Sequence, residues 1–144
     1  MEVATLGYEG LSMERFAEAL RQHGIQTVVD VRDLPLSRKV GFSKTPLERA
    51  LRELGIRYIH AKALGCPKPI RDAYRRDPNW ARYAVAFETY LETRSHEMLD
   101  LAQAARQRRC CLVCFEADAN RCHRSLVAEH LRTLVPDVQI VHLH

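Results

Sequence analysis

The sequence predicts a single three-layer α/β domain over residues 1–144, with a mainly parallel five-stranded sheet covered by helices on both faces. Short apolar segments of strand length alternate with segments of helical periodicity along the chain. One apolar segment, CCLVCF at 110–115, contains no polar residue, as expected for a strand that is buried on both faces. The chain also has the length and the 47% hydrophobic content of one packed domain. Together these observations favour a parallel sheet with helical crossovers.

The first part of the chain predicts a strand, a helix and a second strand. VATLGY at 3–8 is a short apolar strand, and Ser12 is placed to cap a helix that runs to about His23. Gly24 ends this helix, since glycine is favoured just after a helix C-terminus. TVVDVR at 27–32 is rich in β-branched residues and predicts the second strand.

The next segment predicts a capped helix and a third strand. A loop of turn residues precedes Thr45, Pro46 and Glu48, which have the spacing of an N-cap, a first helical position and a capping box. Apolar residues then recur at i, i+3, i+4 and i+7, which is typical of an amphipathic helix. IRYIHA at 56–61 is the third strand, and the proline-containing segment 64–79 is expected to be irregular.

The C-terminal half predicts two strands and two helical regions. A long helical region covers about 80–108 and breaks near Ser95. The strand at 110–115 is followed by a polar loop and by a helix from about 122 to 134, and VQIVHLH at the end of the chain is the fifth strand. The aromatic residues at helical spacing in this region indicate core packing rather than a platform for stacking bases; they are Trp80, Tyr83, Phe87 and Tyr90.

The alternation of strands and helices implies right-handed crossovers in a Rossmann-like or flavodoxin-like arrangement, for which we expect the strand order 3-2-1-4-5. The switch point of such a sheet lies between the first and fourth strands. Ligands of open α/β sheets bind beyond the carboxyl ends of the strands, at the switch point. We therefore expect the loops after strands one, two and four to form one cleft.

Composition and charge restrict the setting and the partners of the protein. With 22 basic and 18 acidic residues the net charge is +4, which permits an anionic small molecule or nucleic acid as partner without demanding either. No apolar run approaches the roughly 20 residues of a membrane span, and the N-terminal segment lacks the features of a signal peptide. Five cysteines without such a signal predict thiols in a cytoplasmic protein. The oligomeric state is not predicted.

The loops of the expected cleft hold residue types that bind anions. Arginine donates bidentate hydrogen bonds to phosphate or carboxylate, and Arg124 and Ser125 also fall in the first turn of a helix, where free backbone N–H groups attract anions. Asp30 is expected to be structural, paired with Arg32 or with backbone N–H groups. The predicted anion-binding residues are Gly7, Tyr8, Arg32, Ser37, Arg38, Lys44, Arg124 and Ser125.

The same loops hold candidates for acid–base and nucleophilic chemistry. Glu116, just past the fourth strand, is the preferred base, with His123 as the alternative. Cys122 is a candidate nucleophile, because a helix N-terminus and neighbouring cations lower a thiol pKa, although lone cysteines are more often packing residues. The phosphatase signature C-x5-R fails, since the sixth residue after Cys114 is Asn120.

A metal site is not predicted. Cys111 and Cys114 have the C-x2-C spacing of a zinc knuckle, and Cys122 and His123 would complete a set of four ligands. Residues three apart in a strand, however, point to opposite faces of the sheet. We therefore predict no cofactor, and structural zinc is the less favoured alternative.

The chain resembles the family catalogued as domain of unknown function 488 over nearly its whole length. The motifs that carry the resemblance are TLGYEG at 5–10, VVDVRDLPLSR at 28–38, GFSK at 41–44, YIHAKALG at 58–65 and CFEADANRCHRSLVAEHL at 114–131. Cys66 stands where the family usually has a second glycine. The resemblance implies an α/β fold and a shared site made of these motifs, but it supplies no reaction.

Two hypotheses about function follow. The first is an enzyme that acts on a phosphorylated or otherwise anionic substrate, such as a nucleotide or nucleic acid, in the cleft at the carboxyl ends of the strands. The second is a module that binds a nucleotide or nucleic acid in the same cleft without altering it. A zinc-stabilised interaction domain is a third and weaker alternative.

Overall fold

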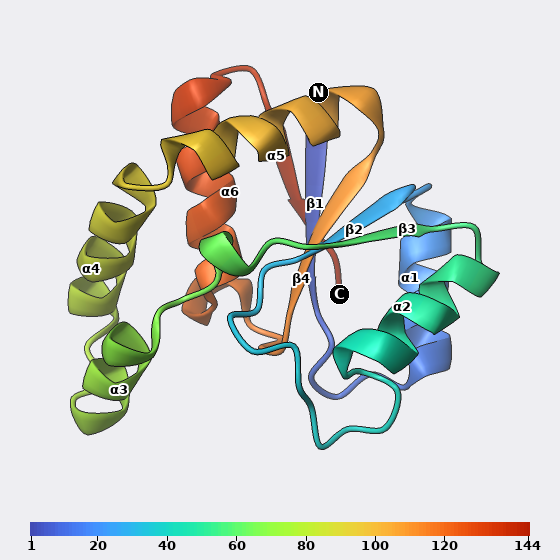
Figure 1. The fold of residues 1–144 in the computed structure, drawn as a ribbon, viewed down its shortest axis with the longest axis horizontal. Coiled ribbons are helices and arrows are strands. Elements are labelled where there is room, and N and C mark those ends of the chain that lie inside the picture. The colour runs from blue at the N-terminus through green and yellow to red at the C-terminus, as the bar shows by residue number, and fades with distance from the viewer.

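The computed structural model describes residues 1–144 as one α/β domain with a five-stranded, all-parallel sheet (Figure 1). The predicted fold class is therefore confirmed. The strands are β1 (Glu2–Gly7), β2 (Thr27–Asp30), β3 (Arg57–His60), β4 (Cys110–Cys114) and β5 (Gln139–His142). The α-helices are α1 (Met13–Gln22), α2 (Lys44–Glu53), α3 (Lys68–Arg76), α4 (Trp80–Glu92), α5 (Ser95–Gln107) and α6 (His123–Leu134). None of the helices is both long enough and apolar enough to cross a membrane.

The strand order is β3-β2-β4-β1-β5, so the expected order 3-2-1-4-5 is wrong in the positions of β1 and β4. β4 pairs with β2 on one side and with β1 on the other, and β5 pairs with the free side of β1. Because β1 and β4 are both apolar and almost wholly buried, their side-chain patterns fit either position. Only backbone pairing distinguishes them. β1 and β4 remain neighbours, and the loops after β1, β2 and β4 still leave the same edge of the sheet.

Helices cover both faces of the sheet and form two hydrophobic cores. On one face, α1 and α2 pack against the strands through Phe16 and Leu47. On the other face, α4, α5 and α6 contribute Phe87, Met98 and Leu131. Figure 1 shows α1 and α2 on one side of the sheet and α5 and α6 on the other. This division follows from the crossovers, which leave β1 and β2 toward one face and β3 and β4 toward the other.

Most helix boundaries agree with the sequence patterns. Ser12 caps α1, with its hydroxyl accepting a backbone N–H of the first turn at 3.1 Å, and the long helical region divides into α4 and α5 at Ser95. The expected cap of α2 is wrong, because Ser43 and not Thr45 occupies the N-cap. The hydroxyl of Ser43 accepts the backbone N–H of Ser37 at 3.0 Å, which fixes the chain just before the helix.

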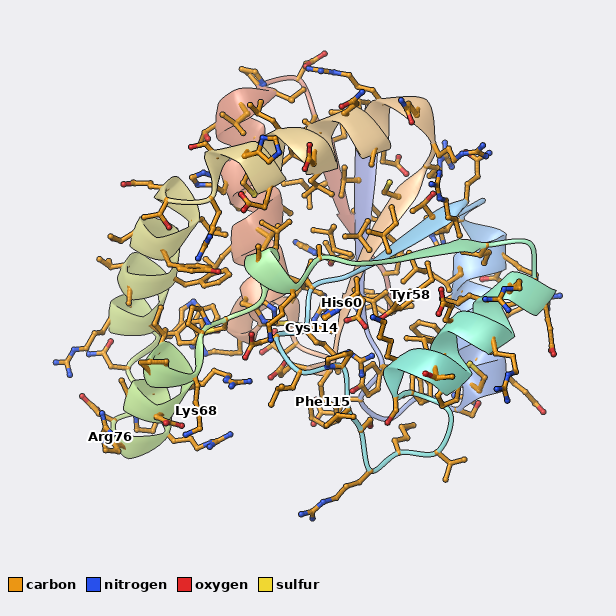
Figure 2. All side chains as sticks on the ribbon, in the orientation of Figure 1. Tyr58, His60, Lys68, Arg76, Cys114 and Phe115 are labelled. Atoms are coloured by element: carbon orange, nitrogen blue, oxygen red, sulfur yellow. A yellow bond between two sulfur atoms is a disulfide. The ribbon has the colours of Figure 1, made fainter.

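The segment 64–79 was expected to be irregular, and this expectation is corrected by α3. Pro69 lies in the first turn of α3, where proline needs no intrahelical partner for its missing N–H. The helix has no buried residue and lies beside α4, away from the sheet; Figure 2 marks its two ends, Lys68 and Arg76. Its contacts with α4 stabilise it, and the partly buried Ile70 and Tyr74 pack against the core.

Candidate functional site

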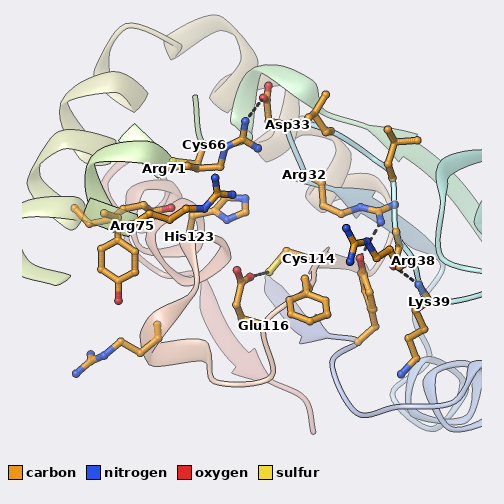
Figure 3. Close-up of a pocket in the computed structure, with 18 of the residues that line it drawn as sticks. Arg32, Asp33, Arg38, Lys39, Cys66, Arg71, Arg75, Cys114, Glu116 and His123 are labelled. Atoms are coloured by element: carbon orange, nitrogen blue, oxygen red, sulfur yellow. Dashed lines mark hydrogen bonds and ion pairs between the residues drawn. The ribbon is translucent and has the colours of Figure 1, made fainter. Parts of the chain in front are cut away.

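One large cavity, of about 730 Å³, opens at the carboxyl ends of the central strands (Figure 3). Loops after β1, β2 and β4 all reach it, and residues of α3 and α4 close its remaining side. The volume lies within the range of roughly 300–1,000 Å³ that is typical of small-molecule sites. The cavity is therefore the candidate site of the protein.

The predicted site residues divide into those that line this cavity and those that do not. The residues that line it are Tyr8, Arg32, Ser37, Arg38, Glu116 and His123. The residues that lie elsewhere are Gly7, Lys44, Cys122, Arg124 and Ser125. Among the latter, Lys44 is exposed at the start of α2, and the hydroxyl of Ser125 donates to the carbonyl of Cys122 at 2.8 Å. The topology thus brings the three loops together but directs only part of each into the cavity.

Arg32, just past β2, is buried at the floor of the cavity, where its guanidinium joins neighbouring groups by hydrogen bonds. Its Nε and Nη2 donate to the two carboxylate oxygens of Asp30, both at 2.8 Å. Its Nη1 donates to the hydroxyl of Tyr8 at 3.1 Å and to the carbonyl of Phe42 at 2.7 Å. Burial by itself would lower the pKa of Arg32, but the ion pair with Asp30 raises that pKa above its ordinary value. Asp30 is therefore structural, as expected, and Arg32 has few donors left for a ligand.

Arg124, in the first turn of α6, is fully buried behind the loop that follows β4. Its Nε donates to Thr5 Oγ1 at 3.2 Å, and its terminal nitrogens donate to the carbonyls of Glu116 and Ala117. Burial lowers the pKa of this guanidinium. Gly7 permits the close packing, because a Cβ at this position would overlap the carbonyl of Glu116. Arg124 and Gly7 therefore shape the loop and do not face the cavity.

Cys114, Glu116, Cys122 and His123 form a cluster at one wall of the cavity, and Figure 3 shows three of these side chains there. One donor atom from each of the four lies within 4.8 Å of the others. The two sulfur atoms are in direct contact, as in a disulfide, although the two Cα atoms are 7.7 Å apart. The carboxylate of Glu116 lies 3.5 Å from the sulfur of Cys114 and 3.3 Å from that of Cys122. The three residues predicted to do chemistry are thus adjacent.

His123 is held by a hydrogen bond from the ring to the loop after β2. Its Nε2 lies 2.5 Å from the carbonyl oxygen of Val31, which only accepts hydrogen bonds, so Nε2 carries the proton. The ring also packs edge-on against Phe87, with centroids 5.5 Å apart. Burial lowers the pKa of His123 below its ordinary value. The imidazole is therefore neutral at pH 7, with its lone pair on Nδ1.

The other three cysteines are free and buried. Burial raises the pKa of the Cys66 thiol and of the Cys110 thiol to about 11, so both are protonated at neutral pH. Cys111 packs in the core under α1 and α2, whereas Cys114 belongs to the opposite core. The prediction that Cys111 and Cys114 point to opposite faces is thus confirmed, and these two do not form a zinc knuckle.

Two arginines of α3 face the cavity. Arg71 pairs through Nη2 with Asp33 at 3.3 Å, while its Nε is buried and has no hydrogen-bond partner. Arg75 is largely exposed and makes only a surface ion pair within its own helix. Arg38, on the opposite rim in Figure 3, also has an exposed guanidinium. Cationic groups from separate segments therefore surround one space.

Aromatic rings form much of the remaining wall. Trp80 stacks on Tyr83 with ring centroids 4.9 Å apart, and the guanidinium of Arg121 lies 5.8 Å from the centroid of Trp80. Phe115 is 44% exposed and meets Tyr8 edge-on at 5.5 Å. Tyr83 is buried, as a core residue should be, but it also lines the cavity together with the half-buried Trp80. The expectation of core packing alone is therefore incomplete for these two residues.

The residues that sequence analysis missed come mainly from α3 and α4. Arg71, Tyr74 and Arg75 recur at i, i+3 and i+4, which is the spacing of one helix face. Pro67 and Pro69 suggested a loop, although proline is also common in the first turn of a helix. A helix that begins at these prolines has one basic and aromatic face, and this signal is present in the sequence.

Comparison with known proteins adds one finding to this geometry. Residues 12–131 match the family described as domain of unknown function DUF488. No match was found among curated proteins or among solved structures. The matched region contains β2, β4 and the loops by which both strands reach the cavity, together with α3 and α4. Because the match covers most of the chain and agrees with the motifs in the sequence, this chain belongs to the DUF488 family.

Proposed function

We propose that the protein is an enzyme that binds a phosphorylated substrate, such as a nucleotide or a nucleic acid end, in this cavity. The observation that carries the proposal is the convergence of basic side chains from three separate segments on one cavity. These side chains come from the β2–α2 loop, from α3 and from the loop before α6, and they are Arg32, Arg38, Lys39, Arg71, Arg75 and Arg121. Only two acidic residues, Asp33 and Glu116, line the same cavity. The balance of charge therefore favours an anion.

Arg71 provides the most specific support. A buried N–H group without a partner costs about 1–3 kcal/mol, so such groups are rare in folded proteins. The buried Nε of Arg71 has no partner in the chain, and its Nη2 is already oriented by Asp33. A phosphate or carboxylate oxygen in the cavity would satisfy this donor. Arginine is suited to the role because its planar donors match the geometry of these anions.

The aromatic wall favours a nucleotide over a simple phosphate. Trp80 and Tyr83 present stacked rings beside the basic side chains, and Phe115 is partly exposed at the edge of the same cavity. A base stacked on an aromatic ring gains about 1–3 kcal/mol, and every base has a suitable face. Phosphate and base would thus meet different parts of one cavity.

Glu116 is the proposed acid–base group. Its carboxylate is exposed, lines the cavity and is positioned by the bonds that Arg124 makes to the adjoining loop carbonyls. His123, being neutral, is the alternative acceptor. Cys122 is buried and does not line the cavity, which argues against a direct nucleophilic role. We propose that this chemistry occurs in the cytoplasm, where cysteines remain reduced.

The proposal is tested by isothermal titration calorimetry, in which the protein is titrated with inorganic phosphate and with a set of nucleotides. Arg71→Ala should weaken binding about tenfold or more, because a hydrogen bond to a charged group contributes roughly 1.5–3 kcal/mol. Arg76→Ala, on the same helix but outside the cavity, is the matched control and should bind as the unaltered protein does. Equal affinities of the Arg71→Ala and unaltered proteins would contradict the proposal.

Non-catalytic binding is the second candidate, and one observation favours it. Two cysteines line the cavity: burial raises the pKa of the Cys66 thiol to about 11, and the sulfur of Cys114 is in contact with that of the buried Cys122. Turnover decides between the two functions: a substrate that is converted by the unaltered protein and not by Glu116→Gln identifies an enzyme. A ligand that binds and is recovered unchanged identifies a binding module. Strong weakening of binding by salt would point to nucleic acid rather than a single nucleotide.

A further inference from the structure

We propose that Cys114, Cys122, His123 and Glu116 bind a Zn²⁺ ion at the wall of the cavity. Their four donor atoms lie within 4.8 Å of one another, although the residues span ten positions of the chain and three different structural environments. Cys114 ends β4, Glu116 lies in the following loop, and Cys122 and His123 begin α6. This inference rests on the four side chains alone and does not require that the cavity bind an anion.

His123 is prepared for metal binding. In metal sites, a histidine ligand usually donates its second ring N–H to a carbonyl or carboxylate, which fixes the tautomer. Here Nε2 donates to the carbonyl of Val31 at 2.5 Å, and Nδ1 is left with a lone pair. The edge-on contact with Phe87 further restricts the ring. A neutral imidazole of fixed orientation is what a zinc ligand requires.

The sulfur and carboxylate groups also suit a cation. Both sulfurs lie within 3.5 Å of the carboxylate of Glu116, so three acidic groups are concentrated in one small volume. Nη1 of Arg124 lies 3.5 Å from the sulfur of Cys114. A divalent cation would compensate the remaining negative charge. Two thiolates with one imidazole favour Zn²⁺ over Mg²⁺ or Ca²⁺, which prefer oxygen ligands.

The backbone spacing fits a bridging ion better than a disulfide. The Cα atoms of Cys114 and Cys122 are 7.7 Å apart, whereas disulfides usually span about 4.4–6.8 Å. Zinc–sulfur bonds of about 2.3 Å at a tetrahedral angle hold two sulfurs about 3.8 Å apart, well beyond the roughly 2 Å of a disulfide bond. An ion between the sulfurs therefore accommodates a wider backbone separation.

One side of the proposed metal site would be open to the cavity. Cys114, Glu116 and His123 line the cavity, and Glu116 is the exposed member of the set. Structural zinc sites keep four protein ligands, whereas catalytic sites leave a position for water or substrate. Because Glu116 is the only exposed ligand, it is the one that a cavity ligand would displace, which would free its carboxylate for the proposed acid–base role.

Cobalt titration of the reduced, chelator-treated full chain tests the inference. We expect one equivalent of Co²⁺ to bind, with thiolate-to-metal charge-transfer absorption and the intense visible bands of tetrahedral cobalt, and one equivalent of Zn²⁺ to displace it. Cys122→Ser and His123→Ala should each weaken Co²⁺ binding at least about 100-fold, because even residues that only orient the ligands contribute 10–100-fold. Cys66→Ala, also a buried cysteine at the cavity, is the control and should retain full binding.

Glu116→Gln keeps the test valid if a cysteine variant fails to fold, since this side chain is exposed. Its Co²⁺ complex should keep the charge-transfer absorption and show shifted visible bands. A folded, reduced protein that gives no charge-transfer absorption with Co²⁺ would overturn the inference. So would a protein purified under reducing conditions whose mass and peptide map show a Cys114–Cys122 disulfide.

Discussion

Two arginines of the sequence motifs, Arg32 and Arg124, differ from two arginines of α3, Arg71 and Arg75, in what their guanidinium groups contact. Arg32 and Arg124 belong to conspicuous motifs, yet both are buried and donate to groups of the protein itself. Arg71 and Arg75 lie in a segment without an obvious motif, and both line the cavity. The first pair builds the loops, and the second pair is available to a ligand.

This difference shows what a structural arginine and a ligand-binding arginine each require of their surroundings. A buried guanidinium is tolerated only when nearly all its donors are satisfied, which Arg32 achieves through Asp30, Tyr8 and Phe42. A ligand-binding guanidinium must instead keep donors free, as Arg71 does with its Nε. Substitutions in the two groups should therefore separate stability from binding.

Arg32→Ala should have the largest effect on stability. It leaves the fully buried carboxylate of Asp30 without its cation, and breaking a buried ion pair in this way costs about 3–5 kcal/mol. The free energy of unfolding, measured in urea, should fall by this amount. Arg57→Ala, an exposed arginine on the adjacent strand, should change it by less than about 0.5 kcal/mol. An Arg32→Ala protein as stable as the original would contradict a structural role for the pair.

Arg124→Met should be the next most destabilising change. It keeps much of the side-chain volume but removes the donors to Thr5 Oγ1 and to the carbonyls of Glu116 and Ala117. Leaving such acceptors unpaired should lower the free energy of unfolding by about 2–3 kcal/mol, and hydrogen exchange of the loop after β4 should increase. Arg132→Ala, an exposed arginine on the same helix, provides the comparison. Unchanged exchange in the loop would show that Arg124 does not hold it.

Arg75→Ala should weaken ligand binding and leave stability almost unchanged. The side chain is 77% exposed and makes only a surface pair with Asp72, so the free energy of unfolding should change by less than about 0.5 kcal/mol. Nucleotide affinity should fall about threefold to tenfold, because one cationic contact at the rim is lost. Arg82→Ala removes a similarly exposed, ion-paired arginine outside the cavity and should leave affinity unchanged. Equal affinities for both variants would remove Arg75 from the site.

Protonation of His142 should have the smallest effect, which is a pH dependence of the free energy of unfolding. The hydroxyl of Thr5 accepts from Arg124 and is also hydrogen-bonded to Nδ1 of His142, at 2.6 Å. Burial, and then the charge of Arg124, lower the pKa of His142 below 6.5. The unfolded chain therefore takes up the proton first as pH falls through about 6.5, and stability should decline until the folded-state pKa is passed.

The check on His142 is the difference between the original protein and His142→Gln in urea midpoint across this pH range. The variant should lose part of the pH dependence, because its side chain does not titrate. Identical pH profiles would show that protonation of His142 is not linked to folding. The other histidines contribute equally to the pH dependence of both urea midpoints, so their contributions cancel in the difference.

The sequence by itself determined the fold class, most element boundaries and the three loops that reach the cavity. These features depend on local patterns: the apolar strand 110–115, the Ser12 cap and the break at Ser95 all report short-range preferences. The structural role of Asp30 was also predictable, since a carboxylate in a buried strand needs a nearby partner. Family membership followed from motifs that the chain carries in order.

Only the tertiary structure decided which residues of those loops face the cavity. The exchange of β1 and β4 depends on backbone pairing between strands of similar composition, which their side chains do not specify. Arg124 turned inward because Gly7 lets the β4 loop approach β1, and α3 brought Arg71 in from a distant segment. The meeting of Cys114, Glu116, Cys122 and His123 likewise depends on where α6 begins relative to β4. Such long-range placement results from packing, and a sequence pattern records it only indirectly.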